Sequence, residues 1–200
     1  MIRALFWDVG GVLLTNAWDH TQRAEALEHF GLDPKEFNER HELVVSSFER
    51  GKISLEDYLE RTVFYRPRAF NRDEFRNFMY SLSRGDAGAL SFARALADSG
   101  KYWMGTINNE SRELNRYRIE KFGMREIFDV FVSSCYVGLR KPEEGIYRMA
   151  LDITQHSPEE CCFIDDRDLN VEAAKRLGMH GVKMEGVEQL RASLRELGVE

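Results

Sequence analysis

The feature that most constrains this fold is a regular alternation of short apolar runs and helix-type segments after residue 85. The apolar runs cover residues 102–107, 130–135, 161–164 and 181–184. Helical patterns separate and flank them, at residues 87–98, 112–122, 143–153, 169–177 and 188–197. Strands that alternate with helices pair in parallel, because each helix carries the chain back across the sheet. The alternation therefore predicts an α/β fold with a doubly wound, Rossmann-type parallel sheet.

A further strand is expected at the start of the chain. Residues 2–7 (IRALFW) form an apolar run that ends at Asp8 and is followed by Gly10 and Gly11. A run this short, closed by glycines, is typical of a buried strand that enters a tight turn. We expect this strand to join the same sheet.

Residues 16–84 separate this first strand from the others and have a different character. They are charged and helix-periodic, which predicts about four helices and no strand. Asp33-Pro34 has the pattern of a helix start, and capping boxes are expected at Ser54–Asp57 and Asn71–Glu74. The chain is therefore expected to consist of an α/β core, residues 1–15 and 85–200, with residues 16–84 inserted as a helical cap.

Composition excludes several classes of protein. The chain has 13 Phe, 7 Tyr and 3 Trp among 43% hydrophobic residues, which excludes disorder. Its net charge of −6 disfavours nucleic acid and anionic membrane surfaces as partners. No apolar run approaches the roughly 18–20 residues that span a bilayer, and the N-terminus is a poor signal peptide. We interpret Cys135, Cys161 and Cys162 as reduced thiols, and expect a cytoplasmic protein.

Polar residues stand where the predicted strands end. Asp8 ends the first strand, Asn108-Asn109 a second and Asp165-Asp166 a third, while Lys141 lies in a loop. Each alone has a simpler reading as a turn residue, a helix cap or a solvated loop. However, ligand sites of such folds lie at the carboxyl ends of the strands. Converging carboxylates there suit Mg²⁺, and a neighbouring lysine suits phosphate. Together they indicate phosphoryl chemistry, with one carboxylate available as a nucleophile.

Three stretches of the sequence resemble motifs of the haloacid dehalogenase-like (HAD) hydrolases. Residues 8–13 (DVGGVL) resemble the first motif, D-x-D-G-[TV]-L. Residues 138–142 (GLRKP) resemble the third motif region, and residues 163–166 (FIDD), with the Asn and Ala residues after them, resemble the fourth. Their order and spacing also match, so the resemblance covers almost the whole chain.

This resemblance implies a Mg²⁺-dependent phosphatase of a small phosphorylated metabolite. Asp8 would be the nucleophile that forms an aspartyl-phosphate. Asp8, the backbone carbonyl of Gly10 and Asp166 would hold Mg²⁺, and Asp165 would support these ligands or replace one of them. Lys141 would neutralise Asp8 and the transferring phosphoryl group. The helical insertion resembles the small cap that selects substrates in one subgroup of the family.

Gly10 departs from the family pattern. The family's phosphatases usually have an Asp there, which protonates the leaving group, and glycine exchanges no proton. General acid–base catalysis contributes about 10²–10⁴-fold, so slow turnover is one expectation. The family's dehalogenases also lack this Asp but lack the full Mg²⁺ set as well, so Asp166 argues against dehalogenation.

The second motif departs as well. The family has Ser or Thr, often followed by Asn, and this chain has Thr106-Ile107-Asn108. If Asn108 matches the family's Asn, Ile107 takes the hydroxyl position, and Thr106 replaces it only if the strand shifts by one residue. We expect Asn108, more than Thr106, to bind the phosphate. The alternative function is a degenerate HAD-fold protein that binds a ligand or partner with little turnover.

Overall fold

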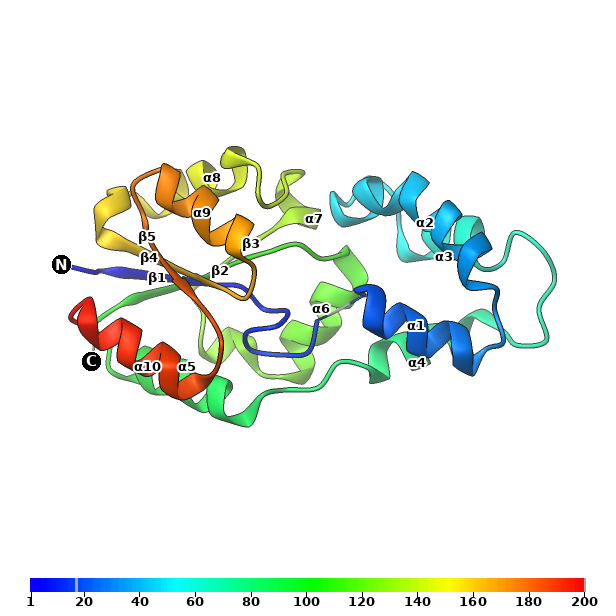
Figure 1. The fold of residues 1–200 in the computed structure, drawn as a ribbon, viewed down its shortest axis with the longest axis horizontal. Helices are drawn as coiled ribbons and strands as arrows, with labels where there is room; N and C mark the ends of the chain where they lie inside the picture. Colours follow the sequence, from blue (N-terminus) through cyan, green and yellow to red (C-terminus); the bar gives the residue numbers. More distant parts are fainter. Residues whose placement is uncertain (17, 200) are drawn as a thin grey trace.

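A single parallel sheet forms the centre of the protein (Figure 1). The computed structural model describes residues 1–16 and 18–199. The strands of this part are β1 (Ala4–Trp7), β2 (Trp103–Asn108), β3 (Val130–Ser133), β4 (Cys161–Asp165) and β5 (His180–Lys183). They pair in parallel in the order β3-β2-β1-β4-β5. The predicted doubly wound α/β fold is confirmed, and the first strand of the chain lies in the middle of the sheet.

Helices cover both faces of this sheet because successive residues of a buried strand point to opposite sides. Leu5 and Trp7 of β1 pack with residues of α5 (Ala87–Asp98) and α10 (Val187–Glu196). Phe6 points the other way and packs with residues of α8 (Glu144–Thr154) and α9 (Asp168–Arg176). Figure 1 shows these two pairs of helices on opposite sides of the strands.

The inserted segment folds into four helices around a hydrophobic cluster that also includes Leu114 of α6 (Arg112–Lys121). They are α1 (His20–His29), α2 (Pro34–Glu49), α3 (Leu55–Thr62) and α4 (Arg72–Ser81). The expected caps are confirmed, since Asp33 accepts a hydrogen bond from Glu36 N, and Ser54 and Asn71 both form capping boxes. Trp18, Phe37, Tyr58 and Phe75 are among the residues buried between these helices. Figure 1 shows the four helices beyond the carboxyl ends of the strands.

The two chain crossings between the sheet region and these helices lie side by side. Thr15 N donates to Arg84 O (2.8 Å), and Arg84 N donates to Thr15 Oγ1 (3.1 Å). Thr15 Oγ1 also donates to Leu82 O (2.8 Å). The segment therefore leaves and re-enters the sheet region at almost the same point.

The strand expected over residues 130–135 is shorter than predicted. The chain turns at residue 134 into a short helix, α7 (Ser134–Val137), which contains Cys135. Ser133 is paired with Asn108, the last residue of β2. Because β2 ends at Asn108, it offers no backbone groups with which residues after Ser133 could pair. The apolar pattern of the sequence alone therefore does not extend β3. The helix α6 (Arg112–Lys121) lies between β2 and β3 in the chain.

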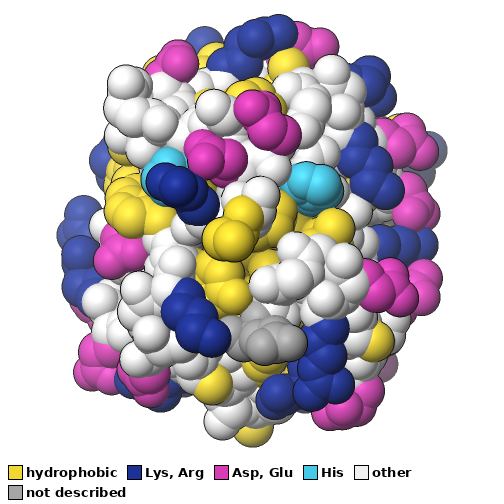
Figure 2. All heavy atoms as spheres, turned by 90° about the vertical axis from the view of Figure 1, so that its left-hand side faces the viewer, with side chains coloured by type: hydrophobic (Ala, Val, Ile, Leu, Met, Phe, Trp, Pro, Cys, Tyr) yellow, Lys and Arg dark blue, Asp and Glu magenta, His cyan; other side chains and the backbone are white. Residues whose placement is uncertain are grey.

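The opposite end of the molecule is formed by the amino ends of the strands. Figure 2 shows this face, where hydrophobic side chains gather in the middle and charged side chains surround them. No helix within the described part of the chain is long and apolar enough to cross a membrane. The three cysteines are buried and unpaired, and burial raises the pKa of each thiol to about 12.

Two glycines in left-handed conformations allow a direct test of the contact between the cap helices and the core. Gly51 (φ +66°) follows α2, and a Cβ there would overlap the carbonyl oxygen of Cys135 in α7. Gly31 (φ +61°) has a similar backbone, with nothing within 4 Å of such a Cβ. We predict that Gly31→Ala lowers the free energy of unfolding by about 1–2 kcal/mol, from the backbone alone. Gly51→Ala should cost a further ~1–3 kcal/mol, because of overpacking.

Urea denaturation of the two variants and the parent measures this difference. Equal losses for both variants would show that the close approach of α2 and α7 is not maintained in solution.

Candidate active site

The tight turn after β1 positions Asp8. Asp8 N donates to Ile164 O (2.8 Å), which continues the pairing of β1 with β4 to the edge of the sheet. Val9 N donates to Asp8 Oδ1 (2.8 Å) and fixes the carboxylate. The turn then closes through Leu13 N and Leu14 N, which both donate to Val9 O. Among the described residues, the contacts found for this carboxylate, from Val9 N and from Lys141, both involve Oδ1.

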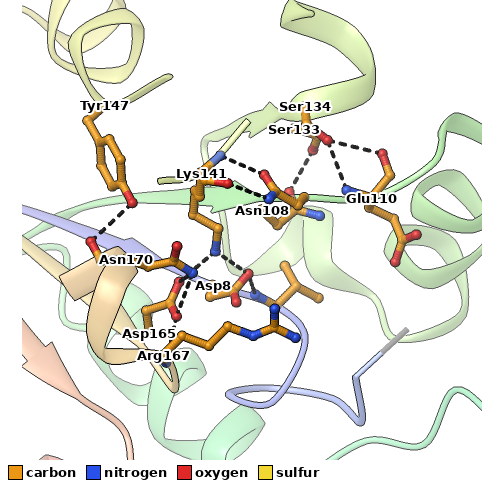
Figure 3. A network of polar contacts seen from close by, with 12 residues as sticks. Asp8, Asn108, Glu110, Ser133, Ser134, Lys141, Tyr147, Asp165, Arg167 and Asn170 are labelled. Carbon is orange, nitrogen blue, oxygen red and sulfur yellow. Dashed lines mark hydrogen bonds and ion pairs between the residues drawn. The ribbon is translucent and has the colours of Figure 1, made fainter. Parts of the chain in front are cut away.

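Lys141 connects two carboxylates at the end of the sheet (Figure 3). Its Nζ lies 2.8 Å from Asp8 Oδ1 and 2.6 Å from Asp165 Oδ2, and the residue is only 5% exposed. The backbone of Lys141 is held by Asn109, whose Oδ1 accepts from Lys141 N (2.9 Å) and whose Nδ2 donates to Lys141 O (3.0 Å). Sequence reasoning placed Asn109 only at a strand end, and nothing in its local pattern indicated this contact.

Asp165 and Asp166 are neighbours in the chain but differ in their contacts. Asp165 accepts hydrogen bonds from Lys141 Nζ, from Arg167 N (2.8 Å) and from Asn170 Nδ2 (3.0 Å). Asp166 Oδ1 is buried and has no hydrogen-bond partner. The carboxylate of Asp165 thus accepts hydrogen bonds from protein donors. Among the described residues, no donor reaches Oδ1 of Asp166.

The Asp8, Asp165 and Asp166 carboxylates form a cluster whose ligand atoms all lie within 4.8 Å of one another. Burial raises the pKa of Asp8 to about 7; the charge of Lys141 opposes this shift, and that of Asp165 adds to it. Burial and then the charge of Asp165 also raise the pKa of Asp166. Three carboxylates against one ammonium leave an excess of negative charge. A hard divalent cation would neutralise this excess and satisfy Asp166 Oδ1, so the residues fit Mg²⁺.

The two glycines after Asp8 have different roles in the turn. Gly11 has a positive φ (+78°), and a Cβ there would overlap the carboxylate of Asp166. Gly10 does not share this left-handed conformation, is half-buried and lines the cavity beside Asp8. Gly11 therefore allows the turn to approach Asp166, which sequence reasoning did not assign to it.

The residues of the second motif separate in space. Thr106 is fully buried inside β2, its hydroxyl has no partner, and it is not among the described residues that line the cavity. Ile107 belongs to the hydrophobic core. Asn108 lines the cavity, accepts from Ser133 Oγ (2.8 Å) and donates to Asn115 Oδ1 (3.0 Å). The structure thus brings Asn108 to Asp8 and Lys141 and leaves Thr106 away from them.

A cavity of about 380 Å³ lies between the cap helices and these residues. The sheet region contributes Asp8, Gly10, Asn108 and Lys141 to its lining, and the inserted segment contributes Trp18, Arg23, His41, Val45 and Glu49. The cavity thus offers space for a small molecule beside Asp8 and Lys141.

Arg118 of α6 also lines this cavity. Its side chain is 2% exposed, and Nη1 lies 2.8 Å from Glu110 Oε2. Burial raises the pKa of Glu110 to about 7, although Arg118 opposes this shift. Nη2 of Arg118 donates to Thr15 O, at the chain crossing into the cap helices.

Comparison with known proteins places this site in a family. The model of haloacid dehalogenase-like hydrolases matches residues 2–178. Flavin mononucleotide hydrolase 1 of Arabidopsis thaliana is 29% identical, over 85% of this chain and 69% of that protein. Sesquiterpene phosphatase astK of Aspergillus oryzae is 28% identical, over 91% and 89%. Bifunctional epoxide hydrolase 2 of Rattus norvegicus is 39% identical, but over only 35% of this chain and 12% of that protein.

Solved structures show the same fold. A HAD family enzyme of Bacteroides thetaiotaomicron, solved in complex with magnesium and inorganic phosphate, superposes with a TM-score of 0.76 and 19% identity, over 92% of this chain and 95% of that one. A HAD-like hydrolase of Porphyromonas gingivalis superposes with a TM-score of 0.75 and 23% identity, over 100% and 99%. With the family match over residues 2–178, this confirms the resemblance seen in the motifs: the chain belongs to the haloacid dehalogenase-like hydrolases.

Proposed function

We propose that this hydrolase is a Mg²⁺-dependent phosphatase of small phosphorylated metabolites, which acts through an aspartyl-phosphate at Asp8. One observation carries the proposal: ligand atoms of Asp8, Asp165 and Asp166 lie within 4.8 Å of one another, Lys141 is buried against two of these carboxylates, and Asp8 and Lys141 line a cavity. The names of two relatives, a flavin mononucleotide hydrolase and a sesquiterpene phosphatase, support phosphate ester hydrolysis.

Asp8 is the nucleophile of the proposed reaction. Lys141 and Val9 N hold Oδ1, so Oδ2 attacks the phosphorus in line with the leaving oxygen and forms the aspartyl-phosphate. Lys141 stabilises the negative charge that gathers on the phosphoryl oxygens during this attack. Water then hydrolyses the aspartyl-phosphate and releases inorganic phosphate.

The proposed metal ligands are Asp8, the carbonyl oxygen of Gly10 and Asp166. The unpartnered Oδ1 of Asp166 favours it over Asp165, whose oxygens already accept from Lys141, Arg167 N and Asn170. Asp165 then serves to orient Lys141. When bound, Mg²⁺ would polarise the phosphoryl group and screen its charge from the carboxylates.

Asn108 is the proposed phosphate contact in the second motif. Its Nδ2 carries two hydrogens, and Asn115 takes one of them. Thr106 receives no role, because its hydroxyl is enclosed in the sheet. We further propose residues 16–84 as a substrate-selecting cap on a core of residues 1–15 and 85–200, with the leaving group in the cavity between them.

The alternative is a protein of this family that binds a ligand with little turnover, and Gly10 is the observation that favours it. Hydrolysis of phosphorylated metabolites, measured with and without Mg²⁺, separates the two functions. The panel should include phenyl phosphate and flavin mononucleotide, and Asp8→Asn should be measured in parallel. Mg²⁺-dependent turnover that Asp8→Asn abolishes supports the phosphatase. Activity that survives in Asp8→Asn comes from a contaminant, and binding without turnover supports the alternative.

The two neighbouring aspartates should differ in Mg²⁺ binding. We predict that Asp166→Ala weakens Mg²⁺ affinity by at least about 10-fold. The loss of a direct metal ligand should weaken metal binding at least as much as the loss of a residue that only supports a ligand. Asp165→Asn keeps the Asp166 oxygens but removes a charge that pairs with Lys141, so it should reduce stability more than metal affinity. Calorimetric titration and urea denaturation of both variants measure these effects. If Asp166→Ala binds Mg²⁺ as the parent does, Asp165 is the ligand.

The residue at position 10 should control how strongly the rate of hydrolysis depends on the leaving group of the phosphate ester. Without an acid there, we predict that the parent hydrolyses nitrophenyl phosphate much faster than alkyl phosphates. Gly10→Asp introduces a carboxylate beside the cavity at a residue that lacks the positive φ of Gly11. It should raise kcat for alkyl phosphates by up to about 10²–10⁴-fold and least for nitrophenyl phosphate. A folded, Mg²⁺-binding variant with the parent's leaving-group dependence would show that the missing acid does not limit turnover.

A further inference from the structure

Three polar side chains of the cap form a buried chain of hydrogen bonds that ends at the cavity. Trp18 Nε1 donates to Tyr58 Oη (2.8 Å), and Tyr58 Oη lies 2.7 Å from His41 Nδ1. Tyr58 is fully buried, and His41 is 3% exposed. Trp18 and His41 both line the cavity, whereas Tyr58 lies behind them. These hydrogen bonds satisfy polar groups that would be costly to bury alone, and they hold the His41 ring in place at the wall of the cavity.

The direction of these hydrogen bonds determines which nitrogen of His41 carries its proton. An indole N–H only donates, so Tyr58 Oη accepts from Trp18 and has its own hydrogen to give. The acceptor at 2.7 Å is His41 Nδ1. Burial, together with the charges of Arg23 and Arg140, lowers the pKa of His41 to about 4, so the ring is neutral at pH 7. A neutral ring whose Nδ1 accepts carries its hydrogen on Nε2.

The wall of the cavity around His41 is polar. Arg23 and Glu49 come from the cap and Arg140 from the core, and Arg140 Nη2 lies 2.7 Å from Glu49 Oε2. Aliphatic and aromatic lining is limited to Trp18, Val45 and Phe48 among the described residues. A hydrocarbon leaving group would remove water from this wall and give its polar groups nothing in return. A leaving group with oxygen or nitrogen acceptors would satisfy them.

We propose that His41 recognises the leaving group of the substrate by donating a hydrogen bond from Nε2, so that the enzyme selects phosphate monoesters of acceptor-rich alcohols over those of hydrocarbon alcohols. The proposal rests on the phosphatase function and specifies its substrate class. The names of the two relatives represent the two classes, since flavin mononucleotide has an acceptor-rich leaving group and a sesquiterpene phosphate has a hydrocarbon one. The polar wall of this cavity favours the first class.

Competing substrates test this selection. Flavin mononucleotide supplies an acceptor-rich leaving group, geranyl phosphate a hydrocarbon one, and phenyl phosphate serves as the reference. We expect the parent to have a higher kcat/KM for flavin mononucleotide than for geranyl phosphate. In His41→Leu, the kcat/KM ratio of flavin mononucleotide to phenyl phosphate should fall by about 2- to 10-fold, as for one hydrogen bond. His41→Gln, which places an amide donor near the position of Nε2, should restore part of the ratio.

His29→Leu is the matched control. This second cap histidine stacks on Phe78 (4.2 Å between ring centroids) and is not among the described residues that line the cavity. In His29→Leu, the kcat/KM ratio of flavin mononucleotide to phenyl phosphate should equal that of the parent. An unchanged ratio in folded His41→Leu, or faster hydrolysis of geranyl phosphate than of flavin mononucleotide by the parent, would overturn the proposal. If no variant hydrolyses phenyl phosphate with Mg²⁺, the phosphatase function itself fails.

Two further measurements do not depend on turnover. Long-range ¹H–¹⁵N spectra of the parent should show His41 as the neutral Nε2–H tautomer at pH 7, and Tyr58→Phe should release this tautomer preference. Calorimetry in an Asp8→Asn background should show flavin mononucleotide binding about 2- to 10-fold more weakly when His41 is replaced by Leu. A neutral Nδ1–H tautomer in the parent, or equal affinity in the two proteins, contradicts the assignment.

Discussion

The buried ammonium of Lys141 is the contact on which the arrangement of the site depends. It lies between the carboxylates of Asp8 and Asp165, and so joins the ends of β1 and β4 to the loop that follows α7. Removal of one partner of a buried ion pair costs about 3–5 kcal/mol, because the remaining charge stays out of water. The ammonium and the two carboxylates therefore stabilise one another, and the loss of any one of them weakens the cluster.

The strand order explains why residues so distant in the sequence meet. β1 lies in the middle of the sheet, with β4 on one side and β2 on the other. The ends of these three parallel strands supply Asp8, Asp165 and Asn108 at the same edge. Asn109, the residue after β2, holds the backbone of Lys141 from across the site. Asp8, Asp165 and Asn108 thus take their positions from the ends of strands. Lys141 comes from a loop, and the side chain of Asn109 holds it in position.

Much of this was predictable from the sequence, because it rests on local signals. Apolar runs and capping residues predicted the strands, the helices and the convergence of Asp8, Lys141 and Asp166. The contacts of Arg118, Asn109 and His41 were not predictable. Arg118 and His41 belong to helices, and helical periodicity does not reveal which polar residue of a helix is buried. Asn109 contacts the backbone of Lys141, which is 32 residues away in the sequence. Such contacts are set by tertiary packing, which a periodic pattern does not encode.

The adjacent chain crossings at Thr15 and Arg84 allow the inserted helices α1–α4 to be replaced as a unit. Their backbones are joined by a hydrogen bond, so the ends of the inserted segment already meet where the sheet region needs them. A different helical insert, longer or shorter, can begin and end at these residues without moving any strand. Exchange of this one segment can therefore change the wall of the cavity, while Asp8, Lys141, Asp165 and Asp166 stay in place.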